Sequence, residues 1–549
     1  MRSTTSLLLC VALAFVGCKK DGGDKASLPS DLVPKAAVVD TSKLKAPALF
    51  AYIPADTPYV LGSFESFPVE YWKKMKKAVA PMFKNLFAKR SSYDRDTESS
   101  RVMDAIVAEL DGKWDAKGLE SLGLSSEPRF AVFGLGLVPV VARIELKDDK
   151  VVLETIQRIA QRAGATLPEQ QTLGNRKYWR LDEHDVSVIV ALDDNQLIAG
   201  FGPTARVDAT LSQILGIDKP KDSMADGKVL AEAMTRHGFG PYIVGFADTA
   251  KLAAAAAAYR GHDLPAECSA AVDKVAKQVP GVAMGYTEIS AKRATGGAVL
   301  ELSSALRDEL KALQTDVPGL ADAMADEPMM AFGAGIDLTK AQKLGQRAAA
   351  TLHDVGEACH SRTLLGFAED MSLAMSQPLP EPLAQITGGV MVLQKLSMSS
   401  SGMPDSVDAY GMITAESGKK LYDSLVAAIP TGSQFGIKAD GSLHKAEIPI
   451  PLPFEFFTGV GDHAIVIASG DKGKRLAEKA LSAKPSGKVP LFVASYDYGQ
   501  LMGLQKKLGS MFGSPTDPAD AMGEVFGRAS FSCDVNDHGL MLWGNLEMK

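Results

Sequence analysis

The chain has 549 residues, of which 46% are hydrophobic and 23% are charged, and its net charge is -7 at pH 7. This is the composition of a globular protein with enough length for two domains. The mild acidity and the lack of a clustered basic patch exclude nucleic acid as an expected partner.

The first eighteen residues have the layout of a secretory signal. Arg2 precedes an apolar run from Leu7 to Val16, which is too short to cross a hydrocarbon layer about 30 Å thick. The run ends in Phe15-Val16-Gly17-Cys18, which resembles a bacterial lipobox. The resemblance implies that residues 1–17 are cleaved as a lipoprotein signal peptide and that Cys18 carries a diacylglyceryl group. An ordinary cleaved signal with an incidental cysteine, or an uncleaved anchor, is the alternative.

Residues 18–46 are polar, charged and dotted with glycine and proline, so this segment is expected to be a flexible tether. In the Gram-negative lipoproteins that the lipobox resembles, an aspartate after the lipidated cysteine favours retention in the inner membrane. Lys19 stands there in this chain. The resemblance therefore implies an outer-membrane lipoprotein, facing the periplasm or the cell surface and held by its acyl chains.

One local design recurs along the body of the chain: a proline, a short apolar strand, and then an acid that opens a helix. It is found at 58–65, 241–248, 328–337 and 490–497. Proline suits the first residue of a strand, and an acid can cap the free amides of the helix that follows.

The surrounding pattern also repeats, which predicts two diverged tandem copies at 47–305 and 327–549, joined by a charged helical linker at 306–326. Each copy is expected to close with a hairpin. One turn is predicted at 294–297 and the other at 536–539. Consecutive strands with short turns favour antiparallel sheets, and the helices between them would cover one face of each sheet. The expected fold class is therefore α+β.

Three cysteines remain in the mature body, which would fold in an oxidising compartment, so at most one intramolecular disulfide can form. Cys533 lies in an alternating strand pattern and is expected to be buried. Cys268 and Cys359 both fall on polar helical segments, so a bridge between these two is the favoured pairing.

The catalytic and metal-like patterns are all incomplete. His353, Glu357 and His360 share one helix face, but they are interpreted as a solvated polar face. Ser417 and Ser469 each stand three residues before a lysine, as in penicillin-binding enzymes, yet the companion motifs are missing, and both are interpreted as helix caps. The sequence thus predicts no catalytic residue, no metal site and no cofactor.

An apolar segment with three prolines runs from Ile448 to Phe457. The prolines place it at a sheet edge or in an extended surface segment. Phe454, Phe456 and Phe457 are candidates for docking a partner or a lipid, and the alternative is that they fill the core of the second copy.

The motif Pro54-Ala55-Asp56-Thr57-Pro58 and the segment 123–136 resemble a group of uncharacterised bacterial lipoproteins, often from myxobacteria-like organisms, which share a conserved domain of unknown function. The resemblance spans most of the mature chain. It implies a compartment and an architecture, and it brings no catalytic residue.

The leading functional hypothesis is a non-enzymatic, lipid-anchored cell-envelope protein that binds or scaffolds a partner protein, an envelope polymer or a lipid. The alternatives are a periplasmic carrier of an apolar ligand or lipid, which needs a dry apolar site, and an envelope hydrolase with an unrecognised site, which needs convergent polar groups in one cleft. The sequence does not specify an oligomeric state.

Overall fold

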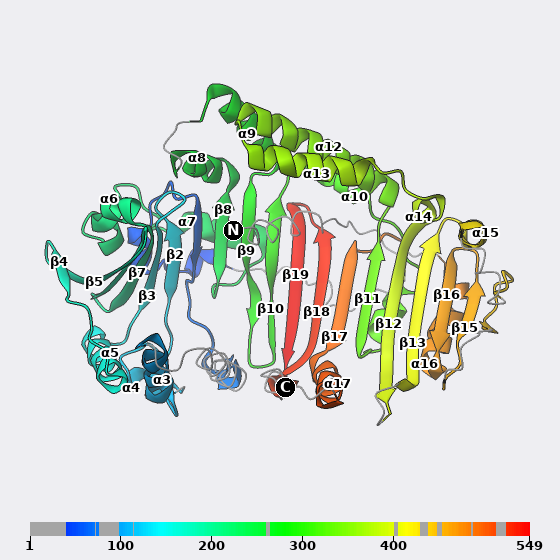
Figure 1. Ribbon diagram of the computed structural model, residues 1–549, viewed down its shortest axis with the longest axis horizontal. Helices are drawn as coiled ribbons and strands as arrows, with labels where there is room; N and C mark the ends of the chain where they lie inside the picture. The colour runs from blue at the N-terminus through cyan, green and yellow to red at the C-terminus, as the bar shows by residue number, and fades with distance from the viewer. Residues whose placement is uncertain are drawn as a thin grey trace.

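The computed structural model describes residues 40–71, 73–75, 98–113, 115–259, 264–399, 404–428, 437–446, 453–484, 487–511 and 523–549. These residues form an α+β fold around one open sheet of 19 strands (Figure 1). Every strand pair in the sheet is antiparallel, which confirms the predicted α+β class. The lipidation candidate Cys18 and the signal peptide lie outside the described residues.

The strands of the amino-terminal half follow one another across the sheet in an order that differs from their order in the chain. From the outer edge to the centre they are β4 (Gln171–Leu173), β5 (Arg176–Glu183), β6 (Val186–Asp193), β7 (Gln196–Pro203), β3 (Val140–Glu145), β2 (Phe130–Gly134), β1 (Tyr59–Gly62), β8 (Val244–Asp248), β9 (Gly281–Ile289) and β10 (Arg293–Glu301).

The carboxy-terminal half continues the sheet from the centre to the other edge. Its strands there are β19 (Gly539–Met548), β18 (Phe526–Val535), β17 (Phe492–Asp497), β11 (Met330–Gly335), β12 (Ile386–Met398), β13 (Pro404–Ala415), β16 (Ala464–Ser469), β15 (Phe457–Val460) and β14 (His444–Lys445).

The two halves meet where β10 pairs with β19, from Arg293 opposite Glu547 to Glu301 opposite Gly539. We call this strand pair the seam. The sequence predicted a separate sheet for each half, and the seam instead joins them into one sheet. An unpaired edge at β10 or β19 would offer a row of free backbone groups, and the pairing of these two edges removes both.

Four helices cover one face of the sheet. In the amino-terminal half, α6 (Thr204–Leu215) and α7 (Lys228–His237) bury Ile214 and Met234 against strand residues such as Phe133. In the carboxy-terminal half, α11 (Leu320–Ala325) and α16 (Gly470–Ser482) pack on residues such as Val390 and Met412. Period-2 alternation in each strand sends these apolar side chains to the helix side, as the sequence predicted.

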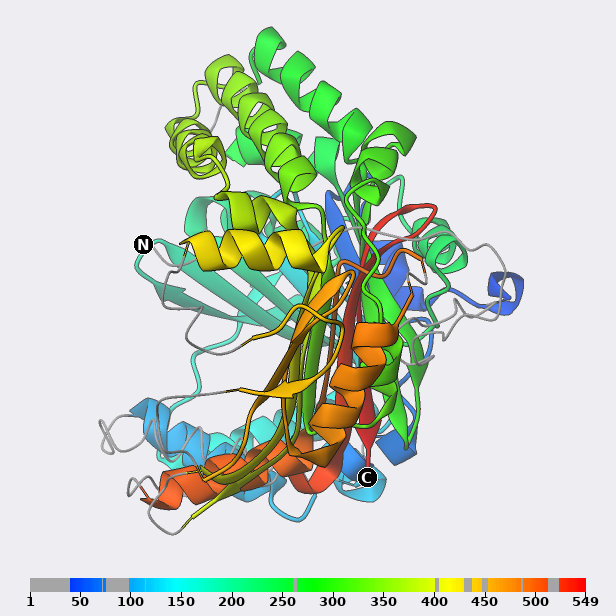
Figure 2. The same cartoon turned by 90° about the vertical axis from the view of Figure 1, so that its right-hand side faces the viewer.

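The other helices lie mainly at the two ends of the strands (Figures 1 and 2). At one end of the sheet are α8 (Thr249–Tyr259), α9 (Ala266–Gln278), α10 (Ser304–Lys311), α12 (Leu338–Ala358), α13 (Arg362–Ser376), α14 (Glu381–Gln385) and α15 (Gly418–Ala428). At the opposite end are α3 (Glu98–Leu110), α4 (Ala116–Ser121), α5 (Asp149–Ala163) and α17 (Tyr498–Met511). The short 3₁₀ helices η1 (Thr41–Lys43) and η2 (Ala48–Tyr52) open the described chain.

Three of the four predicted acid caps are present. Asp248, Asp337 and Asp497 each accept a hydrogen bond of 2.9 Å from the backbone amide three residues later. These bonds satisfy helix amides that would otherwise lack a partner. The prediction is wrong for Glu65, because the next helical turn begins at residue 69.

Two further local predictions are corrected. The first hairpin turns at residues 290–292, and residues 294–297, predicted as the turn, lie inside β10. Ser469 does not cap α16, because its hydroxyl donates to the Glu455 carbonyl at 2.8 Å, and Asp408 accepts the Gly473 amide at 2.7 Å instead. Ser417 does accept the amide of Lys420, at 3.3 Å.

Two of the predicted segment boundaries fall within packed structure. Leu44 and Ala46 pack against the amino-terminal core, so contact with the body begins before residue 47. In the predicted linker, α11 supplies Leu320 and Ala323 to the carboxy-terminal core. Within the predicted linker, residues 306–311 lie in α10 and residues 320–325 form α11, so part of it belongs to the globular body.

Candidate functional site

The sheet face opposite α6, α7, α11 and α16 is the candidate functional site, and we call it the uncovered face. Figure 1 looks onto it. Seven of its large apolar side chains are between 40% and 53% exposed: Leu181, Phe201, Met284, Met391, Ile467, Phe492 and Phe531.

Strand register shows that these residues share one face, because directly opposed residues project to the same side of a sheet. In the carboxy-terminal half one row joins Phe531, Ala494, Phe332, Met391, Gly411 and Ile467. A second row crosses the seam through Val132, Leu61, Gly245, Met284, Ala298, Leu542, Cys533 and Phe492. In the amino-terminal half a third row joins Leu181, Val188, Phe201 and Val140.

Every residue in these three rows is uncharged. From β7 to β16 the rows extend over fourteen strands. At a spacing of about 4.8 Å between strands, that is a width of about 60 Å. Within this width Ala494 and Cys533 are buried, and the seven large side chains named above supply the exposed apolar area. Soluble proteins rarely leave so many large apolar side chains exposed on one face unless that face binds something.

Glycines make the uncovered face nearly flat, because large side chains of neighbouring strands lie over them. A Cβ atom on Gly411 would lie 3.0 Å from Ile467, and one on Gly544 would lie 3.3 Å from the Phe531 ring. On Gly245 it would lie 2.8 Å from Leu61. The large side chains therefore lie over the glycines of neighbouring strands and do not stand upright from the sheet.

Helices border the uncovered face at both ends of the central strands. At one end, Leu310 of α10 and Leu344 of α12 pack with Leu540 and with Cys533, which is buried as predicted. At the other end, Tyr498 of α17 packs with Phe526 and Met548, together with Tyr71 and Met75. The exposed side chains lie between these two borders.

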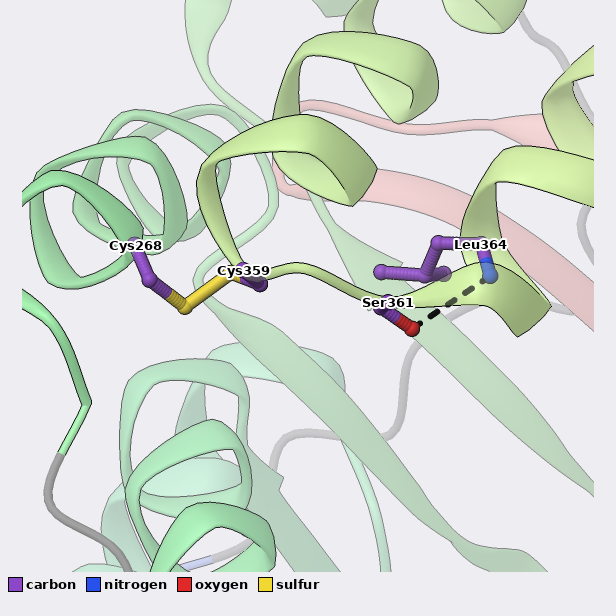
Figure 3. Close-up of a disulfide and its surroundings, with 4 residues drawn as sticks. All are labelled: Cys268, Cys359, Ser361 and Leu364. Atoms are coloured by element: carbon purple, nitrogen blue, oxygen red, sulfur yellow. Dashed lines mark hydrogen bonds between the residues drawn. A yellow bond between two sulfur atoms is a disulfide. The ribbon is translucent and has the colours of Figure 1, made fainter.

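A disulfide joins Cys268 on α9 to Cys359, the residue that follows α12 (Figure 3). This is the pairing that the sequence favoured, and it links the two halves of the chain. Nearby, the Ser361 hydroxyl accepts the Leu364 amide at 3.4 Å and caps α13. The bridge therefore fixes the end of the helix that borders the uncovered face.

A cluster of ionisable groups lies at one end of the seam, on the helix-covered side. The Glu301 carboxylate accepts hydrogen bonds from His237 at 2.8 Å and from Arg236 at 2.6 Å, and the rings of His237 and His538 are 5.4 Å apart. Burial alone would raise the pKa of Glu301. The hydrogen bonds and charges of His237 and Arg236 together outweigh burial, so the pKa of Glu301 lies below its ordinary value. Burial, followed by the nearby His237 and Arg236, lowers the pKa of His538.

The cluster lacks the geometry expected of a catalytic site. His237 has a fully buried side chain, and its Nδ1 atom has no hydrogen-bond partner. A general base must reach a substrate proton, and this imidazole is closed off by the protein around it. The arrangement holds α7, β10 and the β18–β19 turn together.

The phenylalanines that the sequence proposed for partner binding lie in β15 and just before it, near one edge of the sheet. Phe454 and Phe456 contact each other edge to face at 5.3 Å, and all three rings are half-buried. Phe457 opposes Ala468 on the helix-covered side, with the Lys474 ammonium 4.4 Å from its ring centre. Phe457 is therefore not part of the uncovered face.

A signal for the uncovered face was present in the sequence. The strand at 330–335 is apolar on both faces, whereas a strand with one wet face alternates with polar residues.

Across the parts of the chain that the structure describes, no three His, Cys, Asp or Glu side chains are grouped to hold a metal ion. Within those same parts, none of the helices combines the length and apolarity needed to cross a bilayer.

No family model, curated protein or solved structure matches this chain.

Proposed function

We propose that this protein is a lipid-anchored, non-catalytic component of the cell envelope that binds an apolar ligand on its uncovered face. The lipobox-like end of the signal and Lys19 support acylation at Cys18 and placement in the outer membrane. The membrane is then a partner through the acyl chains, and the body is the binding module.

The single observation that carries the proposal is the extent of the uncovered face. Fully burying one Phe, Met or Ile side chain contributes about 1.5–3 kcal/mol, and seven large apolar side chains there remain about half exposed. An apolar ligand would recover this free energy. Among the hypotheses from the sequence, these exposed apolar side chains favour a carrier of an apolar ligand. A hydrolase would need converging polar groups, and the rows of the uncovered face supply none.

We further propose that the two halves are diverged copies of one unit. The order of strands supports this, because β5-β6-β7-β3-β2-β1-β8-β9-β10 corresponds strand by strand to β14-β15-β16-β13-β12-β11-β17-β18-β19. Asp248 at the end of β8 and Asp497 at the end of β17 cap the following helices in the same way. The copies would then contribute to one shared binding surface and not to two separate sites.

The substitution Cys18→Ser tests the anchor and the binding role together. Without the acceptor thiol, the protein should leave the membrane fraction, and its mature mass should lack the acyl groups. The released protein should still yield a bound apolar molecule on solvent extraction and mass spectrometry. Retention on membranes with unchanged mass would refute the anchor, and a released protein without any apolar cargo would refute the binding role.

A further inference from the structure

We infer that the occupant of the uncovered face is the acyl chains of individual lipid molecules, laid across the strands and crossing the seam. This inference rests on the proposed function and names the class of ligand. It follows from the chemistry of the face, from its shape and from the place where the tether leaves the body.

The chemistry of the face fits hydrocarbon better than a protein partner. Protein interfaces carry about one hydrogen bond per 100–200 Å² of buried surface. The three rows present aliphatic, aromatic and sulfur-containing side chains and glycine. At their margin, the Tyr59 hydroxyl already donates to the Leu137 carbonyl at 2.9 Å. An acyl chain needs no hydrogen bond, so it can cover such a surface without leaving a polar group unpaired.

The shape of the face at the seam permits a continuous chain to cross it. Gly296 and Gly544 face each other there, and Ala298 faces Leu542. The ring of Tyr286 lies over Gly296, where a Cβ atom would be 2.8 Å away. The hydrocarbon of one bilayer leaflet is about 15 Å deep, so a face about 60 Å wide accommodates several chain lengths. A lipid with two or more chains therefore fits better than a single small apolar molecule.

The tether starts on the helix-covered side. Thr41, near the first described residue, has its hydroxyl 3.1 Å from that of Thr235 on α7. Twenty-one residues lie between Cys18 and Asp40, and the flexible tether predicted from the sequence would have an r.m.s. reach of about 25 Å. The described chain thus begins on the side opposite the uncovered face. This geometry suits lipid molecules that have been taken out of a bilayer, and it does not suit flat docking of the face on the bilayer that holds the anchor.

The experiment uses the full mature chain carrying Cys18→Ser, incubated with phosphatidylglycerol vesicles that contain a pyrene-labelled phospholipid. After flotation removes the vesicles, phospholipid bound per protein is measured by fluorescence and mass spectrometry. Met284→Glu and Phe531→Glu each place a charge on the uncovered face, one in each half. Val229→Glu is the matched control, since Val229 is 37% exposed on α7. We expect at least one phospholipid per protein, a tenfold or greater loss in each face variant, and no change in the control.

Folding is checked by thermal melting and by retention of the Cys268–Cys359 bridge. A face variant that does not melt like its parent is replaced by Phe201→Glu or Met391→Glu, which lie farther from the seam. If only one of the two variants, Met284→Glu or Phe531→Glu, lost bound phospholipid, acyl chains that cross the seam would be refuted.

An uncharged fluorescent probe, N-phenyl-1-naphthylamine, separates failure of this inference from failure of the proposed function. Probe binding that the face variants abolish, without phospholipid transfer, would overturn the lipid inference and leave the binding function intact. Absence of both would overturn the two together. Flotation of the protein with the vesicles, or a dimer that the face variants dissociate, would assign the face to a bilayer or to a second copy and would also overturn the inference.

Discussion

A buried carboxylate, that of Glu301, lies at one end of the seam. Glu301 lies at the end of β10, with a side chain only 10% exposed, and its carboxylate is shared by His237 and Arg236 from α7. A buried carboxylate needs such partners, because water no longer solvates it. The carboxylate therefore ties α7 to β10 at the end of the seam.

Glu301→Gln should lower the free energy of unfolding by about 2 kcal/mol at pH 7, since it removes charge-assisted hydrogen bonds. The folded pKa of Glu301 lies below its unfolded value, so the carboxylate contributes fully above about pH 4.5 and its contribution falls as the pH drops through the folded pKa. Denaturant unfolding between pH 3 and pH 7 measures both effects. The variant should show a weaker loss of stability in acid than the parent.

A matched control is Glu288→Gln, because Glu288 is exposed on the adjacent strand β9. It should leave the free energy of unfolding within about 0.5 kcal/mol of the parent. If the free energy of unfolding fell equally in acid for the Glu301→Gln protein and the parent, the Glu301 carboxylate would not be the source of the pH dependence.

The inward orientation of the Arg143 side chain could not be predicted from the sequence around it. Arg143 stands in the apolar strand β3 and is 2% exposed, with its guanidinium 3.7 Å from the Tyr52 ring centre and hydrogen bonds to Gln196 and to the Ile214 carbonyl. Burial lowers its pKa to about 10. Its partners come from three other segments of the chain, so local periodicity could not reveal that this charge points inward.

At the scale of elements, the strongest link between the halves outside the sheet is the disulfide between α9 and the end of α12. It closes a loop of 91 residues. In the chain-entropy treatment a loop of that size stabilises the folded state by about 4.5 kcal/mol.

Replacing both Cys268 and Cys359 by serine should therefore lower the denaturant midpoint strongly while preserving the sheet. Reductant should shift the parent protein to the same midpoint and should leave the double variant unchanged. A variant that remains sensitive to reductant would place the relevant bridge elsewhere. A parent that is insensitive under unfolding conditions would remove the bridge as a stabilising element.

Local elements were largely predictable because their determinants lie within a few residues. The acid at Asp248, Asp337 and Asp497 contacts an amide three positions away, so sequence spacing alone is sufficient. The cap of α16 was missed because Asp408 is 65 residues from the amide that it accepts. The first hairpin turn was misplaced because Gly296 and Gly297 resemble turn residues, whereas here they allow close approach to β19.

At the scale of the whole molecule, alternation predicted the antiparallel sheet but not its continuity. Nothing local in β10 or β19 shows that these two strands pair with each other, since their residues are about 250 positions apart. The uncovered face depends on that pairing, because only a joined sheet aligns Met284 of one half with Phe492 of the other in a single row. The ligand-binding role that we propose for it therefore could not be derived from either half alone.

We expect the seam to make the two halves unfold as one cooperative unit, and Gly297 is the position that tests this. A Cβ atom there would lie 2.0 Å from the Leu542 carbonyl oxygen and 2.7 Å from the Trp543 ring, so Gly297→Val must push β10 away from β19. We expect a loss of about 1–3 kcal/mol and a single calorimetric transition that splits into two. Gly527→Ala in β18 is the control, because its nearest contact would be an ordinary 3.6 Å. A variant that still unfolds in one transition at the parent temperature would mean that the halves are coupled by the helices and the disulfide, not by the strand pairing.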